Sequence, residues 1–261
     1  MGDRTSYEPG TFSWVDLATN DTDGAKAFYS GLFGWEYEDM PVGGEGTYTM
    51  CRIGGKDVAA LARQSDQERD QGIPPHWNNY ITVADVDAIS PRISDLNGNL
   101  IMPPFDVLEA GRMALGTDPT GAVFALWEPG NHIGAGLVNV PGAFTWNELG
   151  TTDVEAAKQF YAALFGWTYH DFEGTQFSYT VIRNGDHENG GIRPLGPAEQ
   201  GAPPYWVPYF GSESCVQTSA RATELGGNVL MPTTEVPNGK FAAIADPQGA
   251  VFTIFEGDFD D

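Results

Sequence analysis

The chain has 261 residues, of which 41% are hydrophobic and 12% aromatic, a composition typical of a globular protein. It carries 13 basic and 36 acidic residues, and this formal net charge of −23 argues against nucleic acid and anionic membranes as partners. No apolar run reaches the roughly 18 residues of a membrane span, and the N-terminal residues show no apolar signal region, so we expect a cytoplasmic protein. Two cysteines, Cys51 and Cys215, are too few for a disulfide framework.

One segment near the N-terminus occurs twice. Residues 14–18 alternate between the two sides of an expected strand, and apolar side chains then recur at helical spacing up to Gly34, a typical helix end. Residues 146–167 repeat this segment, so the chain contains a duplicated domain. The residues Trp14, Leu17, Asp21, Ala25, Phe28, Tyr29, Leu32, Phe33, Gly34 and Trp35 return as Trp146, Leu149, Asp153, Ala157, Phe160, Tyr161, Leu164, Phe165, Gly166 and Trp167.

Each half divides further into two units with the order βαβββ. After the first helix we expect three short strands within residues 35–62, then a polar stretch at 64–73 that leads to a second unit. The second unit is expected to contain strands at 77–83, 99–103 and around 112–116 and 122–127, with a helix at 86–96. The predicted domains are residues 8–130, with modules 8–65 and 75–130, and residues 140–257, with modules 140–196 and 203–257.

Three motifs recur in the same order in both halves. They are a helix with the pattern D-x-x-x-A-x-x-F-Y-x-x-L-F-G-W, a P-P-x-W start of a strand, and a D-P-x-G-A turn before the last strand. This ordered set resembles the vicinal oxygen chelate superfamily, which includes glyoxalases, extradiol dioxygenases and bleomycin-resistance proteins. The chain is also similar to two-domain actinobacterial members described as glyoxalase-like proteins or hydroxylases. The resemblance implies an α+β fold in which two modules form a curved, eight-stranded half-barrel sheet, with helices outside and a cavity inside.

The superfamily usually holds a divalent metal ion through His, Gln or Glu side chains on three strands. The corresponding positions here are Trp14, Asn78 and Ala125 in the first half and Trp146, Val207 and Thr253 in the second. None of these residues is a good metal ligand. The histidines His76, His132, His170 and His187 lie beside or outside these positions. We therefore expect no metal ion and no other cofactor.

The cavity implied by the resemblance would be aromatic and mildly acidic. Asp16 and Glu148 are the matched acidic pair on the inward faces, and a carboxylate in an apolar pocket can act as a general base. The alternative is that each carboxylate only accepts hydrogen bonds from neighbouring donors. The expected ligand-binding residues are Trp14, Asn78, Tyr80 and Trp127 in the first domain and Trp146, Val207, Tyr209, Thr253 and Phe255 in the second.

Two functions fit these residues. The first is a metal-independent protein that binds or sequesters a hydrophobic aromatic small molecule. The alternative is an enzyme: a hydroxylase or oxygenase in which Glu148 deprotonates an electron-rich aromatic substrate, or a glyoxalase-like lyase, which would lack an electrophile. We expect a monomer or a weak homodimer, because the fused domains can replace the dimer of shorter relatives.

Overall fold

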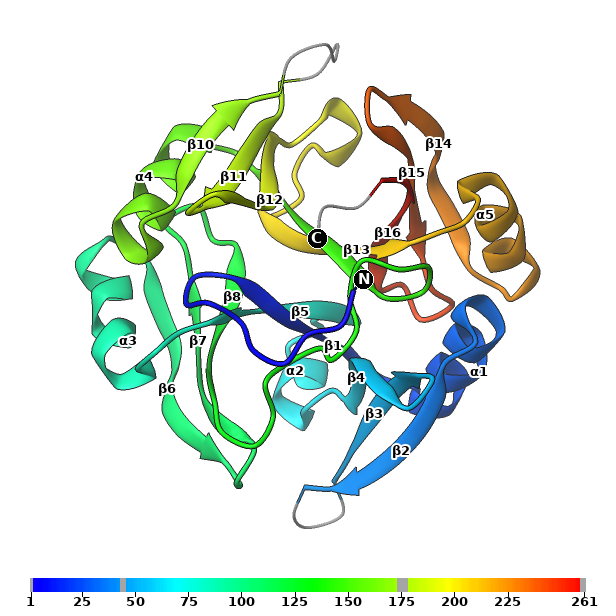
Figure 1. Cartoon of the computed structure of the whole chain (residues 1–261), viewed down its shortest axis with the longest axis horizontal. Helices are drawn as coiled ribbons and strands as arrows, with labels where there is room; N and C mark the ends of the chain where they lie inside the picture. The colour runs from blue at the N-terminus through cyan, green and yellow to red at the C-terminus, as the bar shows by residue number, and fades with distance from the viewer. Residues whose placement is uncertain (1, 43–45, 173–177, 259–261) are drawn as a thin grey trace.

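The computed structural model describes residues 2–42, 46–172 and 178–258. Its strands form two eight-stranded mixed sheets, one from each half of the chain, which confirms the predicted α+β duplication (Figure 1). The first sheet contains β1 (Phe12–Thr19), β2 (Glu36–Pro41), β3 (Thr47–Ile53), β4 (Lys56–Arg63), β5 (His76–Thr82), β6 (Asn99–Val107), β7 (Gly111–Thr117) and β8 (Val123–Pro129). The second contains β9 (Phe144–Thr151), β10 (Thr168–Asp171), β11 (Thr180–Asn184), β12 (His187–Pro194), β13 (Tyr205–Gly211), β14 (Asn228–Val236), β15 (Gly239–Ala245) and β16 (Val251–Gly257).

Both sheets have the same strand order. It is β2-β3-β4-β1-β5-β8-β7-β6 in the first sheet and β10-β11-β12-β9-β13-β16-β15-β14 in the second. The first strands of the two modules, β1 and β5, pair antiparallel at the centre of the first sheet, and each pairs in parallel with the last strand of its own module. The central pair therefore joins two four-stranded modules into one continuous sheet.

Each module of the repeat contains one long helix, and two short helical segments lie between the modules. They are α1 (Thr22–Phe33), α2 (Asp66–Asp70), α3 (Val86–Asp95), α4 (Val154–Phe165) and α5 (Cys215–Glu224), with a 3₁₀ turn, η1 (Pro197–Glu199). The Asp21 side chain caps α1 by accepting a hydrogen bond from the backbone N–H of Gly24, and Gly34 ends the helix at φ 73°. No helix in the described residues is long and apolar enough to cross a membrane.

Two segments differ from the expectation. The polar stretch at 64–73 contains α2, which begins with a capping box between Ser65 and Glu68. The strand expected at 99–103 continues to Val107 through Pro103 and Pro104. Prolines are tolerated there because β6 is an edge strand and its pairing with β7 shifts register between Met102 and Phe105.

The duplicated helices pack between the two sheets and join the halves. Phe28 on α1 contacts Phe252 of the second sheet with ring centroids 6.3 Å apart, and the Tyr29 hydroxyl donates to Asp246 at 3.1 Å. Phe160 on α4 contacts Phe124 of the first sheet in the same way, at 5.9 Å. The aromatic residues of the repeated motif therefore form one core that both halves share.

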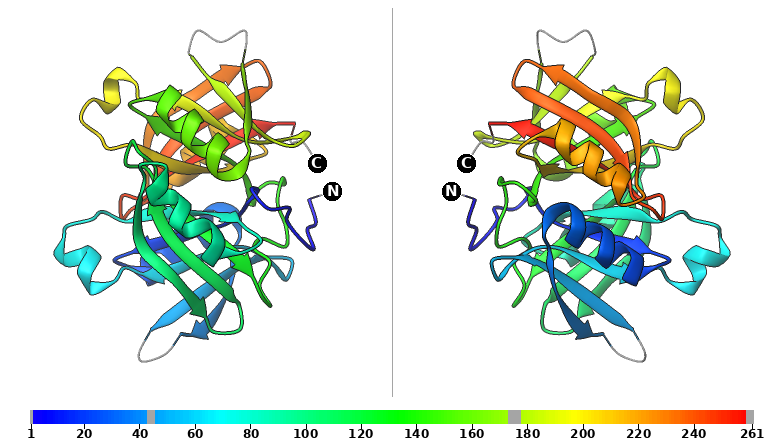
Figure 2. Two further views of the ribbon diagram at one scale, coloured as in Figure 1. Left: turned by 90° about the vertical axis from the view of Figure 1, so that its left-hand side faces the viewer. Right: turned by 90° about the vertical axis from the view of Figure 1, so that its right-hand side faces the viewer.

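Two arginines complete this interface. Neither α1 nor α4 has a basic residue in its last turn, but each receives an arginine from the other half. Arg221 on α5 donates to the Gly31 carbonyl at 3.2 Å, and Arg92 on α3 donates to the Ala163 carbonyl at 2.5 Å. Figure 2 shows the resulting pairs, with α3 beside α4 on one side of the molecule and α1 beside α5 on the other. Cations at these helix ends also complement the helix dipole.

Candidate functional site

The predicted inward-facing residues share one face of each sheet, the concave face opposite the helices. In the first sheet, Trp14 lies opposite Tyr80 and Asp16 lies opposite Asn78, while Trp127 lies opposite Thr82. Phe12 is turned to the other side by a register shift before Trp14, and its ring centroid lies 4.8 Å from that of Trp206. Strand alternation thus places the expected residues together on the concave face.

The first concave face has Asp16 at its centre. The carboxylate is 5% exposed and accepts hydrogen bonds from the Asn78 amide (2.9 Å), the Tyr80 hydroxyl (2.7 Å) and the Tyr48 hydroxyl (2.9 Å). Burial raises the pKa of the Asp16 carboxyl, although these hydrogen bonds partly oppose the shift. Tyr48, which the sequence analysis did not single out, also accepts a hydrogen bond from the Trp14 indole at 2.9 Å.

The linker that follows the first sheet covers Trp14. The His132 ring packs edge-on against Trp14 with centroids 4.6 Å apart, and its backbone carbonyl accepts a hydrogen bond from the Trp127 indole at 2.9 Å. Trp14 and Trp127 are consequently only 3% and 5% exposed. Burial lowers the pKa of His132, which favours the neutral imidazole in this position.

The second concave face has an ionic cluster at the corresponding place. Glu148 accepts hydrogen bonds from Arg193 Nε at 2.6 Å and from the Tyr209 hydroxyl at 2.5 Å. The other guanidinium nitrogens of Arg193 donate to both carboxylate oxygens of Glu199, at 2.7 and 2.9 Å. Burial opposes ionisation of Glu199, but hydrogen bonds from Arg193 and Tyr205 lower its pKa to about 2.

Several residues of this cluster were missed in the sequence analysis. Arg193 lies in a strand of mostly polar residues and glycines, and its contact with Glu148 depends on the pairing of β12 with β9, which no local pattern specifies. Tyr179 lies across Gly191, where a Cβ atom would be 2.0 Å from the tyrosine hydroxyl, so the glycine makes room for the ring. The Tyr179 hydroxyl accepts a hydrogen bond from the Trp146 indole at 2.9 Å, as Tyr48 does from Trp14.

Exposure separates the remaining predicted residues into two groups. Val207, Tyr209 and Thr253 are buried in the wall of the second concave face, at 4%, 7% and 4% exposure. Trp146 and Phe255 are only half-buried. Two flat aromatic side chains of the second half are therefore accessible to solvent, whereas their counterparts in the first half are covered.

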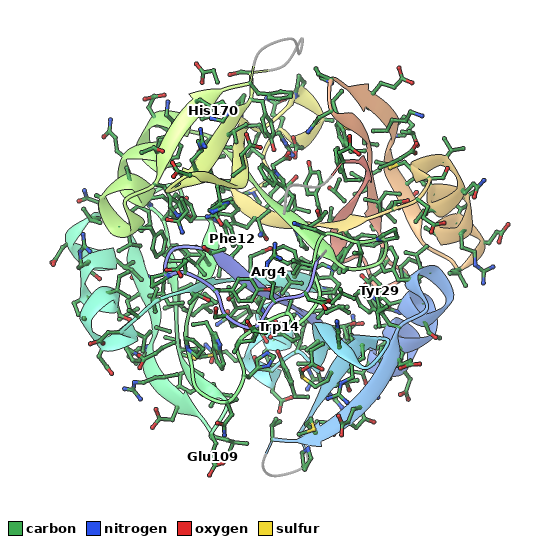
Figure 3. The ribbon with its side chains drawn as sticks, viewed as in Figure 1. Arg4, Phe12, Trp14, Tyr29, Glu109 and His170 are labelled. Carbon is green, nitrogen blue, oxygen red and sulfur yellow. The ribbon has the colours of Figure 1, made fainter. Side chains whose placement is uncertain are left out.

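The residues at the superfamily's metal-binding positions do not fit a metal ion. Trp14, Ala125, Trp146 and Val207 offer no suitable donor atom, and the amide of Asn78 is bound to Asp16. His170 lies on the edge strand β10 and contacts Glu188 at 3.6 Å (Figure 3). Within the described ranges, no three His, Cys, Asp or Glu side chains gather closely enough to hold a metal ion.

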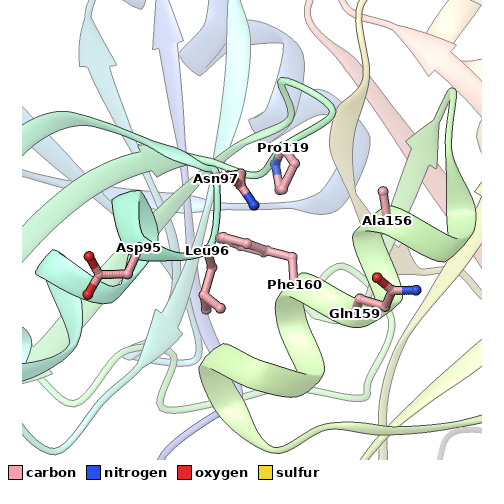
Figure 4. A pocket seen from close by; sticks show the side chains of 7 residues that line it. All are labelled: Asp95, Leu96, Asn97, Pro119, Ala156, Gln159 and Phe160. Atoms are coloured by element: carbon pink, nitrogen blue, oxygen red, sulfur yellow. The ribbon is translucent and has the colours of Figure 1, made fainter.

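Two surface clefts lie away from the concave faces. One, of about 250 Å³, lies between the end of α3 and α4, with Leu96, Pro119 and Phe160 among its walls (Figure 4). The other, of about 540 Å³, follows the η1 loop and includes Glu199. Glu199 is the residue that this cleft shares with the Arg193 cluster.

Two curved sheets built from βαβββ modules, with aromatic and acidic concave faces, define a protein of the glyoxalase and extradiol dioxygenase type. Solved structures show the same fold. The Mn(II)-bound glyoxalase from Novosphingobium aromaticivorans aligns with a TM-score of 0.66 and 18% identity, over 100% of this chain and 86% of that one. The 2,3-dioxygenase LapB from Pseudomonas sp. KL28 aligns with a TM-score of 0.67 and 12% identity, over 97% and 94%.

Residues 11–126 and 143–254 match the family described as the Glyoxalase/Bleomycin resistance protein/Dioxygenase superfamily, and the chain belongs to it. It is 43% identical over 259 residues to "Putative glyoxylase CFP32" of Mycobacterium tuberculosis, covering 98% of each chain. It is 38% identical over 262 residues to "Anthracycline biosynthesis protein DnrV" of Streptomyces peucetius, covering 97% of this chain and 95% of that one. The predicted family is thereby confirmed.

Proposed function

We propose that the protein binds a hydrophobic aromatic small molecule on its second concave face, without a metal ion. The observation that carries the proposal is the half-buried state of Trp146 and Phe255 beside the buried residues Val207, Tyr209 and Thr253. Large flat rings that remain partly exposed offer a surface on which a planar ligand can stack. The hydroxyls of Tyr179 and Tyr209 lie at the same face and add polar contacts.

The relatives support an aromatic ligand. One of them is named for anthracycline biosynthesis, and anthracyclines contain a planar, fused aromatic ring system. The similarity extends over nearly the full length of both chains. We expect the same ligand class here, carried or sequestered by a single chain or a weak homodimer.

Binding is tested with 1,8-dihydroxyanthraquinone as the probe and quenching of tryptophan fluorescence as the signal. Wild-type protein should bind one equivalent. Trp146→Ala should weaken binding about tenfold or more, because stacking of a planar ring on an aromatic side chain is worth about 1–3 kcal/mol. Leu230→Ala is the matched control, since Leu230 is an exposed apolar residue of the same sheet. Equal affinities in wild type and Trp146→Ala would contradict the proposal.

A hydroxylase or oxygenase is the second candidate, because the name of the anthracycline relative refers to biosynthesis. Glu148 is then the candidate base, and Asp16 its counterpart in the first half. Both carboxylates already accept hydrogen bonds from protein donors, which favours the binding function. The lyase alternative is weaker still, because the guanidinium of Arg193 is engaged by Glu148 and Glu199 and is not free to act as an electrophile.

Incubation in air with a panel of aromatic polyketides and hydroquinones distinguishes binding from oxygenation. A compound recovered at unchanged mass supports the binding function. A gain of one oxygen atom that requires the protein, and that is lost in Glu148→Gln while the compound still binds, would establish the enzyme instead.

A further inference from the structure

Two aromatic side chains of the second half lie directly on the backbone of their sheet. A Cβ atom added to Gly191 would lie 2.0 Å from the Tyr179 hydroxyl oxygen and 2.3 Å from Cζ of the same ring. A Cβ atom added to Gly257 would lie 2.7 Å from both Cε1 and Cζ of Phe255. Any side chain at either position would therefore push the ring away from the sheet, and glycine is what permits the close approach.

Both glycines belong to the second concave face. Gly191 on β12 lies opposite Glu148 on β9, and residues opposite each other point to the same side of a sheet. The Tyr179 hydroxyl, which lies over Gly191, accepts the hydrogen bond of the Trp146 indole at 2.9 Å. Gly257 follows Phe255 by two positions on β16 and so shares its side of the strand. The two lowered rings thus lie on the same face as Trp146.

The first concave face has neither glycine. Ala60 takes the place of Gly191, as the residue opposite the acidic side chain of the central strand. Pro129 takes the place of Gly257, as the residue opposite the first glycine of the preceding strand. Side-chain atoms of the first half therefore occupy the positions at which the second half has the rings of Tyr179 and Phe255.

We propose that Gly191 and Gly257 make the second concave face selective for planar, fused-ring molecules over aromatic molecules whose rings are twisted out of one plane. This inference rests on the proposed function and adds the shape of the ligand and the residues that set it. Rings that lie on the sheet backbone form a low, level surface beside Trp146. A planar molecule contacts such a surface with all of its rings, whereas a twisted molecule can stack only one of them.

The charges at this face fit an uncharged ligand. Glu148 accepts hydrogen bonds from Arg193 at 2.6 Å and from the Tyr209 hydroxyl at 2.5 Å. The remaining guanidinium nitrogens of Arg193 donate to Glu199. A ligand at this face therefore meets charges that are already paired, so its own charge is not needed for binding and its shape decides the affinity.

The test compares two uncharged phenols that differ in planarity. In 1,8-dihydroxyanthraquinone the two phenol rings are fused into one plane, and in 2,2′-dihydroxybenzophenone a single carbonyl joins them and they are twisted. Quenching of tryptophan fluorescence gives both affinities. Wild-type protein should bind the planar ligand about tenfold or more tightly, which is the loss expected when one ring leaves a stack.

Substitution of the glycines should remove this preference. Gly191→Ala should weaken binding of the planar ligand about tenfold and change that of the twisted ligand little, because the new methyl group lifts the Tyr179 ring. The same substitution should have no further effect in a Tyr179→Ala background, since the glycine acts through that ring. Gly136→Ala is the matched control, because an added Cβ atom there meets its nearest neighbour at 3.9 Å, an ordinary contact.

Gly257→Ala, at the end of β16, lifts Phe255 and should reduce the preference in the same direction, so the test stands even if Gly191→Ala fails to fold. Equal affinity of wild type for the two ligands overturns this inference and leaves the proposed function standing. So does an unchanged preference in the glycine variants that fold, or an effect of Gly191→Ala that persists without the Tyr179 ring. If wild type binds neither ligand, the proposed function and this inference fail together.

Discussion

The two concave faces differ more than the shared core beneath them. In the first, Asp16 is held by neutral donors and Trp14 is covered by His132; in the second, Glu148 is paired with Arg193 and Trp146 is half-buried. On the core side the two halves use the same aromatic contacts. The residues between the sheets, which hold the fold together, are alike in the two halves. The residues on the concave faces can therefore differ without loss of the fold.

The largest expected effect comes from the covered tryptophan. Trp14→Ala should destabilise the protein by about 3–5 kcal/mol, because it removes a large buried side chain and leaves a cavity beneath His132. Trp146→Ala should cost clearly less, because its ring already contacts solvent. Urea unfolding of both variants measures the contrast, and equal losses would show that the two tryptophans have equivalent surroundings.

The next effect concerns the internal cation. Arg193→Ala should lower the unfolding free energy by about 3 kcal/mol, because it leaves the buried Glu148 without its charged partner. Arg69→Ala is the control, since Arg69 forms an exposed ion pair with Asp66 and should change stability by no more than about 0.5 kcal/mol. A loss in Arg193→Ala no larger than in the control would mean that Glu148 needs no cation.

The smallest effect is a pH dependence of the first face. Burial raises the pKa of Asp16, so the folded state binds this proton more tightly than the unfolded chain. The contribution of Asp16 to stability therefore falls as the pH rises above the usual aspartate range and through the raised value. Asp16→Asn removes this dependence. The unfolding free energy of wild type relative to Asp16→Asn should therefore fall as the pH rises through this range. A difference that stays constant with pH would show that the pKa of Asp16 is not raised in the folded state.

Much of the fold was predictable from local signals. The caps at Asp21 and Gly34 act within one helical turn, and the alternation in β1 reports its two faces directly. The continuation of β6 through Pro103 was not predictable, because the edge position of the strand and the register shift at the prolines are both set by its pairing with β7. The short helix α2 was hidden by its polar composition.

The candidate site was predictable in part, for a similar reason. Strand alternation placed Trp14, Asp16 and Tyr80 on one face, and the structure shows them together. Tyr48 contacts Asp16 and Arg193 contacts Glu148. Both contacts depend on how neighbouring strands pair, which no local sequence pattern specifies, so they were not predicted. The role of these residues in ligand binding remains a prediction that the experiments above address.

The sequence by itself determined the duplication, the βαβββ modules and the family, because these depend on periodicity, caps and turns that act over a few residues. Only the tertiary structure decided that α1 and α4 pack against the sheet of the other half, and that one buried carboxylate has an arginine while its counterpart does not. Both depend on which strands and helices become neighbours. That choice is made by burial of apolar surface over the whole chain, and no short segment records it.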